Sequence, residues 1–464
     1  MANVVLIPTW VRKDHFLEVA YVLRDAGHDV TYASFLDIES AVTAHDFRFV
    51  RLESVSGALR DAPSLNSLPG QLGRAQRWFT RWFARRSRRD EQAIRQGLNT
   101  LVDKFSEFDP GLFLIDMELP GHVFAALGGH KRVALVSTLL SPWKRPGLPP
   151  QHRNLAPPVG DNTASKRFEI AWLRLYIWKR WRQTVDYLRQ AGADRTAMLR
   201  QFAARNGLNW HEIVDPWQWP LPFSYRKLPV ITLNALELDF PHEPHPDARF
   251  VGPVMCRRRI SNPDMDPEQQ VRLDALVQRC RSDEHKRLIY CSFGRFAESY
   301  EQGLLLRLVS ACQQRPEWTL LVALGDSDLP PTFDKLPENA HTFGWLPQLR
   351  VLKEVDCAII HAGISSINEC IYQEVPMVLY PLRLNDQQGN AARVAWHGLG
   401  ICANRETDTV EDMIQHIDQA MNSESIRTRL KEMHMQFNRY VDDESLLTAV
   451  NAAMRAPEIK GLPS

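Results

Sequence analysis

The sequence predicts an α/β protein built from two doubly wound parallel-sheet domains that face each other across a cleft. Three observations indicate this architecture. Short apolar runs alternate with helical segments in both halves, as in parallel sheets covered by helices. The 464 residues exceed one domain of ordinary size. Residues 1–230 carry 32 Lys and Arg against 22 Asp and Glu, whereas residues 231–464 carry 24 against 33, which favours two domains with different roles.

The first half opens with the β-α-β pattern of a parallel sheet. Residues 4–8 form an apolar run, and a helical segment follows that ends at Gly27. Residues 30–32 predict a second strand, and residues 112–115 and 133–136 predict two further buried strands. Strands joined by helices in this way run parallel.

Two helical segments rich in Arg and Trp, at 70–95 and 165–205, interrupt this pattern. Seven prolines between residues 216 and 246 mark non-helical passages after them. Because few regular elements are expected there, we place the interdomain linker at about 225–255.

The second half repeats the architecture of the first. Strands are expected at four apolar runs, residues 288–292, 320–324, 358–360 and 377–380. The expected domains are therefore residues 1–230 and 231–464, and the final helix can pack back on the first domain. In such folds a ligand binds at the carboxyl ends of the strands, here in the cleft.

Several protein classes are not expected. The N-terminus lacks a basic segment followed by a long apolar one, so no signal peptide is expected, and no apolar run approaches the length of a membrane-spanning helix. The seven cysteines are odd in number, begin at Cys256 and contain no C-x-x-C pair, which indicates reduced thiols rather than disulfides or a zinc site. We therefore expect a cytoplasmic protein.

A turn of small residues follows the strand expected at 358–360. It runs from His361 through Gly363 to Ser365 and Ser366, where a helix begins. Free N–H groups and the positive end of the helix dipole at such a turn suit a phosphate group. An alternative needs no ligand, because Ser366 and Glu369 have the spacing of a helix capping box.

The segment 344–400 resembles the donor-binding signature of the UDP-glycosyltransferase superfamily, the family 1 glycosyltransferases with the GT-B fold. The signature opens with W-x-P-Q, present here from Trp345 to Gln348. It continues with H-x-G-x-[NS]-S-x-x-E, from His361 to Glu369, and closes with V-P-M-x-x-x-P and D-Q-x-x-N-A, which here begin at residues 375 and 386. Several spaced elements in this order are more specific than any one of them.

The resemblance implies a role for each matching residue of the donor site. Trp345 would stack on the uracil ring, and Gln348 would bind the base or the ribose. The diphosphate would be held by His361, Gly363, Ser365 and Ser366. Glu369 would accept hydrogen bonds from the ribose hydroxyls, and the transferred sugar would be bound by Asp386 and Gln387. No metal and no other cofactor are expected, because a helix terminus and polar side chains can carry the diphosphate charge.

The chain departs from the family pattern at two places. One extra residue lies between Glu369 and the D-Q pair, so Asn385 competes with Asp386 for the sugar-binding place. After the strand at 288–292, Gly294 and Arg295 stand where the family often has a glycine followed by serine or threonine. Arg295 either binds the diphosphate or points to solvent.

Inverting sugar transfer needs a base to take the acceptor proton, and the family uses a histidine oriented by a carboxylate. Counting back from Gly27 places Arg12 at the usual histidine position, whereas His15 lies one helical turn later. We take His15 as the candidate base and Asp116 as its carboxylate partner, with Glu118 as a substitute. The alternative for His15 is an ordinary surface position on the helix.

The acceptor is expected in the basic, aromatic first half. Residues 74–89 and 172–182 interleave Arg and Lys with Trp, Phe and Tyr, which suits an amphiphilic, lipid-like or acidic acceptor, or a peripheral membrane contact. In the alternative reading, the aromatic residues pack on the core and the arginines form a solvated face. Nucleic acid is not expected, since no nucleic-acid-binding module accompanies the charge.

These observations together predict an inverting glycosyltransferase that moves a sugar, glucose first, from a UDP-sugar to a small acceptor. Three alternatives remain at this stage. One is a transferase for dTDP-deoxysugars and natural products, and another is a nucleotide-sugar epimerase or hydrolase with the same fold. The third is a non-catalytic GT-B partner protein that binds a nucleotide without turnover.

Overall fold

The computed structural model of the chain describes most of its residues. They are residues 2–52, 88–108, 110–158, 166–189, 194–216, 224–256, 265–294, 302–325, 336–382 and 386–456. The expected Arg- and Trp-rich segment at 74–87 and the candidate residues Asn385 and Arg295 lie outside these ranges.

The first half forms one seven-stranded parallel sheet of order β3-β2-β1-β4-β5-β8-β9. Its strands are β1 (Asn3–Ile7), β2 (Asp29–Ser34), β3 (Arg48–Arg51), β4 (Leu112–Asp116), β5 (Val133–Ser137), β8 (Val230–Thr232) and β9 (Ala248–Phe250). The strands β1, β4 and β5 are almost wholly buried, as continuous apolar runs in a doubly covered sheet must be.

Helices cover both faces of this sheet. Alternate side chains of β1 point to opposite faces, so Val4 and Leu6 meet α1 (Lys13–Asp25) and α2 (Glu39–Thr43), while Val5 and Ile7 belong to the opposite core. That opposite core includes α4 (Arg88–Ser106), α5 (Pro120–Gly128) and α7 (Arg195–Arg205). The long helix α6 (Lys166–Arg189) also belongs to this half. Four short elements complete it: α8 (Trp210–Ile213), β6 (Val214–Asp215), β7 (Ser224–Tyr225) and the 3-10 helix η2 (Leu236–Leu238).

The second half forms a six-stranded parallel sheet of order β12-β11-β10-β13-β14-β15. Its strands are β10 (Arg287–Ser292), β11 (Trp318–Ala323), β12 (Ala340–Phe343), β13 (Cys357–Ile360), β14 (Met377–Leu379) and β15 (Gly400–Cys402). One face carries α9 (Pro267–Arg281), α11 (Gln348–Leu352), α12 (Ile364–Tyr372), α13 (Gln387–Trp396) and α15 (Glu424–Asp442). The other face carries α10 (Gln302–Gln313) and α14 (Val410–Asn422).

The region expected as a linker, 225–255, contains two strands of the first sheet. Because β8 pairs with β5 and β9 pairs with β8, the first sheet continues to Phe250, beyond the expected boundary at residue 230. We therefore place the boundary after β9. Three-residue strands surrounded by prolines leave too short an apolar run to be recognised in the sequence.

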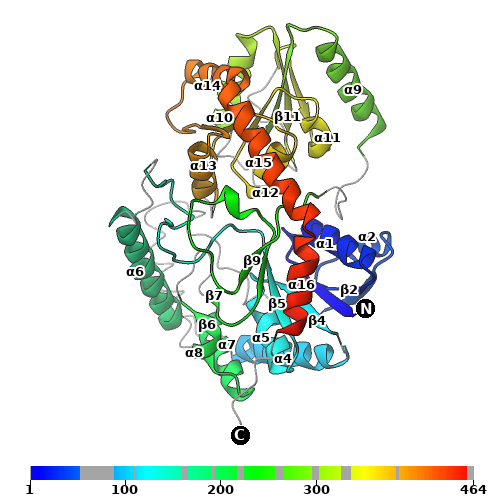
Figure 1. Cartoon of the computed structure of the whole chain (residues 1–464), viewed down its shortest axis with the longest axis vertical. Coiled ribbons are helices and arrows are strands. Elements are labelled where there is room, and N and C mark those ends of the chain that lie inside the picture. The colour runs from blue at the N-terminus through cyan, green and yellow to red at the C-terminus, as the bar shows by residue number, and fades with distance from the viewer. Residues whose placement is uncertain are drawn as a thin grey trace.

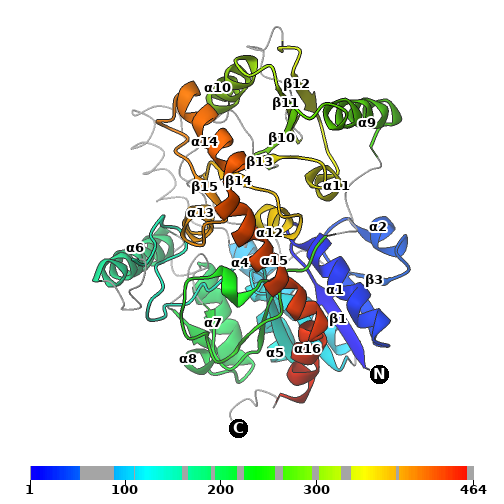
Figure 2. The same cartoon turned by 45° about the horizontal axis from the view of Figure 1, so that its top comes forward.

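The chain returns to the first half at its end. Helix α15 packs on the second sheet, whereas α16 (Ser445–Arg455) inserts Leu446, Ala449 and Val450 into the core that holds Val4 and Leu6. Figures 1 and 2 show these two helices running from the upper domain down onto the lower one. The two-domain α/β architecture predicted from the sequence is confirmed. No helix in the described part of the chain is long and apolar enough to span a bilayer.

Candidate active site in the interdomain cleft

The turn after β13 forms an open helix N-terminus. Helix α12 begins at Ile364, and its N-cap residue, Gly363, provides no side-chain hydrogen bond to the first turn. The alternative with Ser366 as the capping residue of a capping box is therefore wrong, since the helix starts two residues earlier. The free N–H groups of the first turn and the positive end of the helix dipole face the space in front of Gly363.

His361 lies tightly between two glycines of this turn. A Cβ atom on Gly294 would lie 2.9 Å from Cε1 of His361, and one on Gly363 would lie 2.7 Å from its Nε2. Only glycine therefore fits at either position. Burial lowers the pKa of His361 despite an opposing hydrogen bond with the main chain of Ser292, so the ring is neutral near pH 7.

Ala362 holds the turn in a strained shape. Its φ of 64° lies in the left-handed region, which costs a residue with a Cβ atom roughly 1 kcal/mol. Its carbonyl oxygen accepts a hydrogen bond of 3.1 Å from Nδ2 of Asn390 on α13. The hydrogen bond from Asn390 thus helps to stabilise this conformation of the turn.

His15 reaches this turn from the other domain. Its Nε2 lies 3.2 Å from Oγ of Ser365, in the first turn of α12, and the two residues are 350 positions apart in the chain. His15 is only partly exposed. The alternative of an ordinary surface position is wrong for His15, because its ring lies in the cleft.

A buried guanidinium, that of Arg12, lies at the position where the sequence register predicts the histidine of the family. Arg12 donates from Nη1 to Oδ1 of Asp116 at 2.7 Å, from Nη2 to Oε1 of Glu118 at 2.6 Å, and from Nε to Oγ1 of Thr138 at 2.6 Å. Burial alone would lower the pKa of Arg12, but the charges of Asp116 and Glu118 outweigh burial and raise it above the ordinary value. Arg12 is therefore a permanent cation and cannot accept a proton.

The expected pairing of His15 with Asp116 is not formed. Oδ1 of Asp116 accepts from Arg12 at 2.7 Å and from N–H of Glu118 at 3.0 Å, while Oδ2 accepts from the hydroxyl and N–H of Thr9 at 2.5 and 3.3 Å. A carboxylate has about four acceptor directions, and all of them are used. The sequence contained one sign that Arg12 has a special place here: counting back from Gly27 put Arg12, and not His15, at the expected position of the base.

The residues expected to bind the base lie at the same edge of the second sheet. Trp345 is partly exposed and lies between β12 and α11, and Gln348 is the first residue of α11. The hydroxyl group of Tyr290, on β10, donates to Oε1 of Gln348 at 3.1 Å. Glu369 lies on α12 and is buried.

The D-Q pair lies at the start of α13, facing the first domain. Asp386 is the N-cap residue and accepts a hydrogen bond of 2.9 Å from Nδ2 of Asn390. Burial raises the pKa of Asp386, and the charges of Arg12 and Glu118 act on it from across the cleft. The side-chain oxygen of Gln387 accepts from N–H of Leu382 at 3.0 Å.

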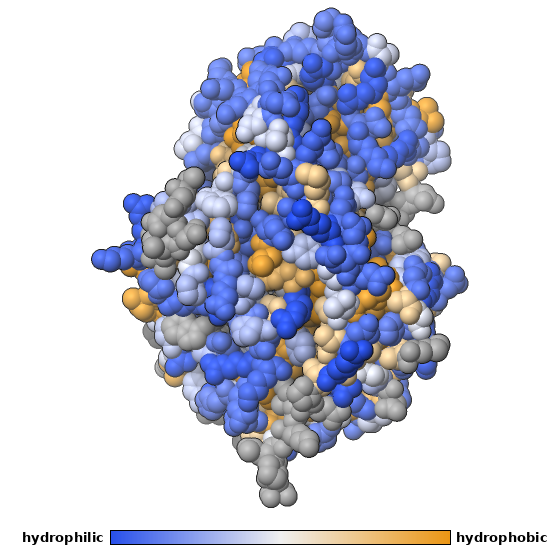
Figure 3. Space-filling model, viewed as in Figure 1, coloured by the Kyte–Doolittle hydropathy of each residue, from blue (hydrophilic) through white to orange (hydrophobic). Residues whose placement is uncertain are grey.

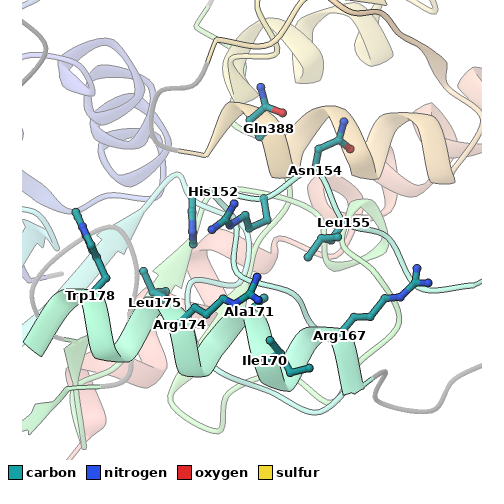
Figure 4. Close-up of a pocket in the computed structure, with 11 residues that line it drawn as sticks. His152, Asn154, Leu155, Arg167, Ile170, Ala171, Arg174, Leu175, Trp178 and Gln388 are labelled. Atoms are coloured by element: carbon teal, nitrogen blue, oxygen red, sulfur yellow. The ribbon is translucent and has the colours of Figure 1, made fainter.

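A cavity of 1140 Å³ lies beside the D-Q pair, between α6 and the segment 152–155 (Figure 4). Three arginines and apolar side chains from the first domain line it, together with Gln388 from α13; among them are Arg153, Arg167, Arg174, Leu155 and Trp178. The cavity thus combines positive charge with apolar surface next to the first residues of α13. Within the described residues, no group of three or more His, Cys, Asp or Glu side chains is placed to hold a metal ion.

Comparison with known proteins relates the second half to sugar transferases. The sequence model of the family "UDP-glucoronosyl and UDP-glucosyl transferase" matches residues 227–445. The chain is 25% identical over 396 residues to the oleandomycin glycosyltransferase of Streptomyces antibioticus, an alignment that covers 84% of this chain and 76% of that protein. It is 26% identical over 144 residues to the NDP-glycosyltransferase YjiC of Bacillus licheniformis, covering 31% of this chain and 36% of YjiC.

The whole chain resembles solved structures in fold. The crystal structure of the glycotransferase of kitacinnamycin superposes with a TM-score of 0.66 at 18% identity and covers 98% of this chain and 99% of its own. Among the curated relatives, the alignment often spans little more than a third of the relative, as for YjiC and for human UDP-glucuronosyltransferase 1A6, at 38%. The range matched by the family model, residues 227–445, contains the turn at His361.

Proposed function

Because the chain belongs to the UDP-glycosyltransferase superfamily, whose fold is GT-B, we propose that it is an inverting glycosyltransferase that moves a hexose from a UDP-sugar to a small amphiphilic acceptor. Glucose is the first candidate for the sugar. A dTDP-deoxysugar donor with a natural-product acceptor is the alternative, in line with the name of the oleandomycin relative.

The open N-terminus of α12 is the observation that carries this proposal. It offers main-chain N–H groups, the hydroxyl groups of Ser365 and Ser366 and the imidazole of His361 to one small region of the cleft. Neutral His361 can donate one N–H to a phosphate oxygen without carrying charge of its own. As the bond to the diphosphate breaks, negative charge grows on the leaving oxygen, and these preorganised donors stabilise it.

The remaining donor contacts follow from the positions of the signature residues. Trp345 would stack on the base and Gln348, held by Tyr290, would bind the base or the ribose. Glu369 would accept from the ribose hydroxyls. Asp386 and Gln387 would bind hydroxyl groups of the transferred sugar.

His15 is the proposed base. In the reaction the acceptor oxygen attacks the anomeric carbon opposite the diphosphate, its proton passes to His15, and the nucleoside diphosphate leaves. Arg12 cannot take this proton, because it is a permanent cation bound to Asp116 and Glu118. We therefore propose that His15 acts as the base without being oriented by the carboxylate of Asp116. Arg12 and Asp116 instead hold the loop between β1 and α1 in place.

The cavity between α6 and α13 is the proposed acceptor site. Its arginines suit an acidic group, and its Leu, Ile and Trp side chains suit an apolar body. Gln388 lines the cavity and follows Gln387 directly, so an acceptor there would lie next to the transferred sugar.

Calorimetric titration with UDP, dTDP and GDP, without added metal, tests the donor assignment. We expect UDP to bind and Trp345→Ala to weaken binding at least about tenfold, since base stacking on an aromatic side chain contributes roughly 1–3 kcal/mol. Trp181→Ala, at an exposed position of α6, is the matched control and should bind UDP as the unchanged protein does. Preference for dTDP would favour the alternative donor, and no binding of any nucleotide would remove the donor assignment.

His15→Ala separates transfer from simple binding. We expect UDP binding to persist and transfer from UDP-glucose to fall by about 100-fold or more, because general-base catalysis is worth roughly 10²–10⁴ in rate. His28→Ala, in the turn before β2, is the control and should leave transfer unchanged. Transfer at the normal rate in His15→Ala would exclude His15 as the base.

One observation favours a second function. A protein whose histidine position is held by a salt-bridged arginine can bind a nucleotide without transferring its sugar. In that case UDP would bind and Trp345→Ala would weaken UDP binding. Neither the unchanged protein nor its variants would transfer or hydrolyse the sugar of UDP-glucose in a screen of amphiphilic acceptors.

A further inference from the structure

Helix α6 carries an apolar face that nothing in the described structure covers. Among the described residues, 13 large apolar side chains are exposed, and seven of them lie on this one helix. They are Ile170, Leu173, Ile177, Trp178, Trp181, Tyr187 and Leu188. Helix α6 lies at the outer edge of the molecule in both views (Figures 1 and 2), and hydrophobic residues appear at the same edge in Figure 3.

The spacing of these residues places them opposite the side that anchors the helix. Phe168, Ala171, Trp172, Leu175 and Lys179 are buried and attach α6 to the domain, and Nε1 of Trp172 donates to the carbonyl oxygen of Leu148 at 2.7 Å. With 3.6 residues per turn, residues 170, 173, 177, 181 and 188 lie on the opposite side. The stripe therefore points away from the described part of the first domain, with Ile170 at its edge toward the cavity.

Basic side chains flank the stripe on both sides. Arg167 and Arg174 lie on one side and Arg180 on the other, and all three are exposed. The acidic residues described on the helix are already paired: Glu169 with Lys144 at 2.7 Å, and Asp186 with Arg182 at 3.9 Å. An apolar stripe with tryptophan and arginine at its sides matches the boundary between the headgroups and acyl chains of an anionic bilayer.

We propose that α6 docks this protein on the surface of a membrane that contains anionic lipids. The helix lies flat in the headgroup region, with residues 173, 177, 181 and 188 among the acyl chains and the arginines against lipid phosphates. It does not cross the bilayer, because its other face is packed in the protein.

Charge argues against the other occupant, a second copy of the chain. Two copies related by a two-fold axis would bring the same stripe together, and Arg174 and Arg180 of one copy would then face those of the other. Anionic lipid instead neutralises these arginines. Each basic residue near such a surface strengthens binding by about fivefold at physiological salt.

The proposal also connects to the cavity described above. Ile170, Arg174 and Trp178 line that cavity and come from the same helix (Figure 4). If the cavity binds the acceptor, which rests on the proposed function, an amphiphilic acceptor dissolved in the membrane has only a short path into it. Membrane docking itself does not depend on any transfer activity.

Vesicle co-sedimentation of the full chain tests the proposal. We expect binding to vesicles of phosphatidylcholine and phosphatidylglycerol in equal parts, much weaker binding to phosphatidylcholine alone, and loss of binding as salt rises. The combined variant Leu173→Gln, Ile177→Gln, Trp181→Gln removes the three central apolar side chains of the stripe, keeps every charge and should weaken binding more than about tenfold. Absence of binding to anionic vesicles by the unchanged protein would overturn the proposal.

A matched control removes equal numbers of exposed apolar side chains elsewhere. Val271→Gln, Met435→Gln and Val441→Gln lie on α9 and α15 at similar exposure and should bind vesicles as the unchanged protein does. Equal binding by the stripe variant and this control would refute the role of α6. The role of α6 in membrane binding would also be refuted by a second result. In that result, analytical ultracentrifugation shows a dimer of the unchanged protein that dissociates in the stripe variant, and neither protein binds vesicles.

Thermal unfolding followed by circular dichroism checks that both combined variants fold. If the stripe variant melts early, Trp181→Gln alone, at a position 63% exposed, takes its place. The lipid and salt dependence of the unchanged protein also tests the proposal without any variant, because adsorption of an unfolded fraction would not require anionic lipid.

Discussion

His122 is a buried histidine without a hydrogen-bond partner for its Nε2. It lies in α5, stacks on Phe35 with ring centroids 5.4 Å apart, and is only 5% exposed. Burial, with a smaller effect of the charge of Arg195, lowers the pKa of His122 to about 4. An ordinary histidine in the unfolded chain has a pKa near 6.5, so the unfolded state binds the proton first as pH falls.

This difference predicts a loss of stability at acid pH. Between pH 7 and pH 5 protonation of His122 in the unfolded chain costs the native state about 2 kcal/mol, rising to about 3 kcal/mol below pH 4. His122→Gln should remove this part of the pH dependence when the free energy of unfolding is measured by urea titration at both pH values. His285→Gln, at an exposed position, should keep it. Parallel curves for His122→Gln and the unchanged protein would contradict the assignment.

Helix α13 depends on one glycine for its approach to the first domain. The N–H of Gly389 donates to the carbonyl oxygen of Gln151 at 2.8 Å, and a Cβ atom on Gly389 would overlap that carbonyl group. The same helix supplies Asp386 to the cleft and Asn390 to the turn at Ala362. The close packing of one element thus positions both the sugar side and the phosphate side of the candidate site.

Gly389→Ala should therefore disturb the protein although alanine favours helices. We expect a loss of about 1–3 kcal/mol in the free energy of unfolding, as in other overpacked sites, and weaker UDP binding. Gly303→Ala, in α10 with open space around it, should be neutral or stabilising by up to about 1 kcal/mol. Chemical denaturation and calorimetry measure both effects; equal stability of the two variants would show that the segment at Gln151 yields at little cost.

The two halves of the molecule are joined by buried polar contacts as well as by α16. Arg393, on α13, donates from Nε to Oδ1 of Asp239 at 2.6 Å, and both side chains are fully buried. Asp239 follows η2 and also accepts from N–H of Ser141. Burial alone would raise the pKa of Asp239, but the charge of Arg393 outweighs it and lowers the pKa below its ordinary value.

Breaking this pair should destabilise the whole molecule. Arg393→Met leaves Asp239 charged and buried without its partner, so we expect a loss of about 3–5 kcal/mol. Arg350→Met breaks a pair with Asp274 of the same 2.6 Å length whose side chains are about half exposed, and it should cost less than about 1 kcal/mol. The difference in melting temperature measures this; similar losses in both variants would mean that the interface opens and hydrates Asp239.

The features that could be predicted before folding is considered are those that depend on short stretches of chain. The apolar runs at β1, β4, β10 and β13 marked strands because doubly covered parallel strands are apolar throughout. The signature between residues 344 and 400 identified the superfamily, because several short motifs occur there in the order that the family has. Strands of three residues, such as β8 and β9, were too short to be recognised.

Contacts between groups far apart in the chain could not be predicted in this way. Periodicity reports the environment of neighbouring residues, whereas a hydrogen-bond partner is chosen by how whole elements dock. The sequence analysis paired Asp116 with His15, whereas in the folded loop Asp116 binds Arg12, 104 positions away. His15 contacts Ser365 instead, 350 positions away, because the two domains pack with the start of α1 near the N-terminus of α12.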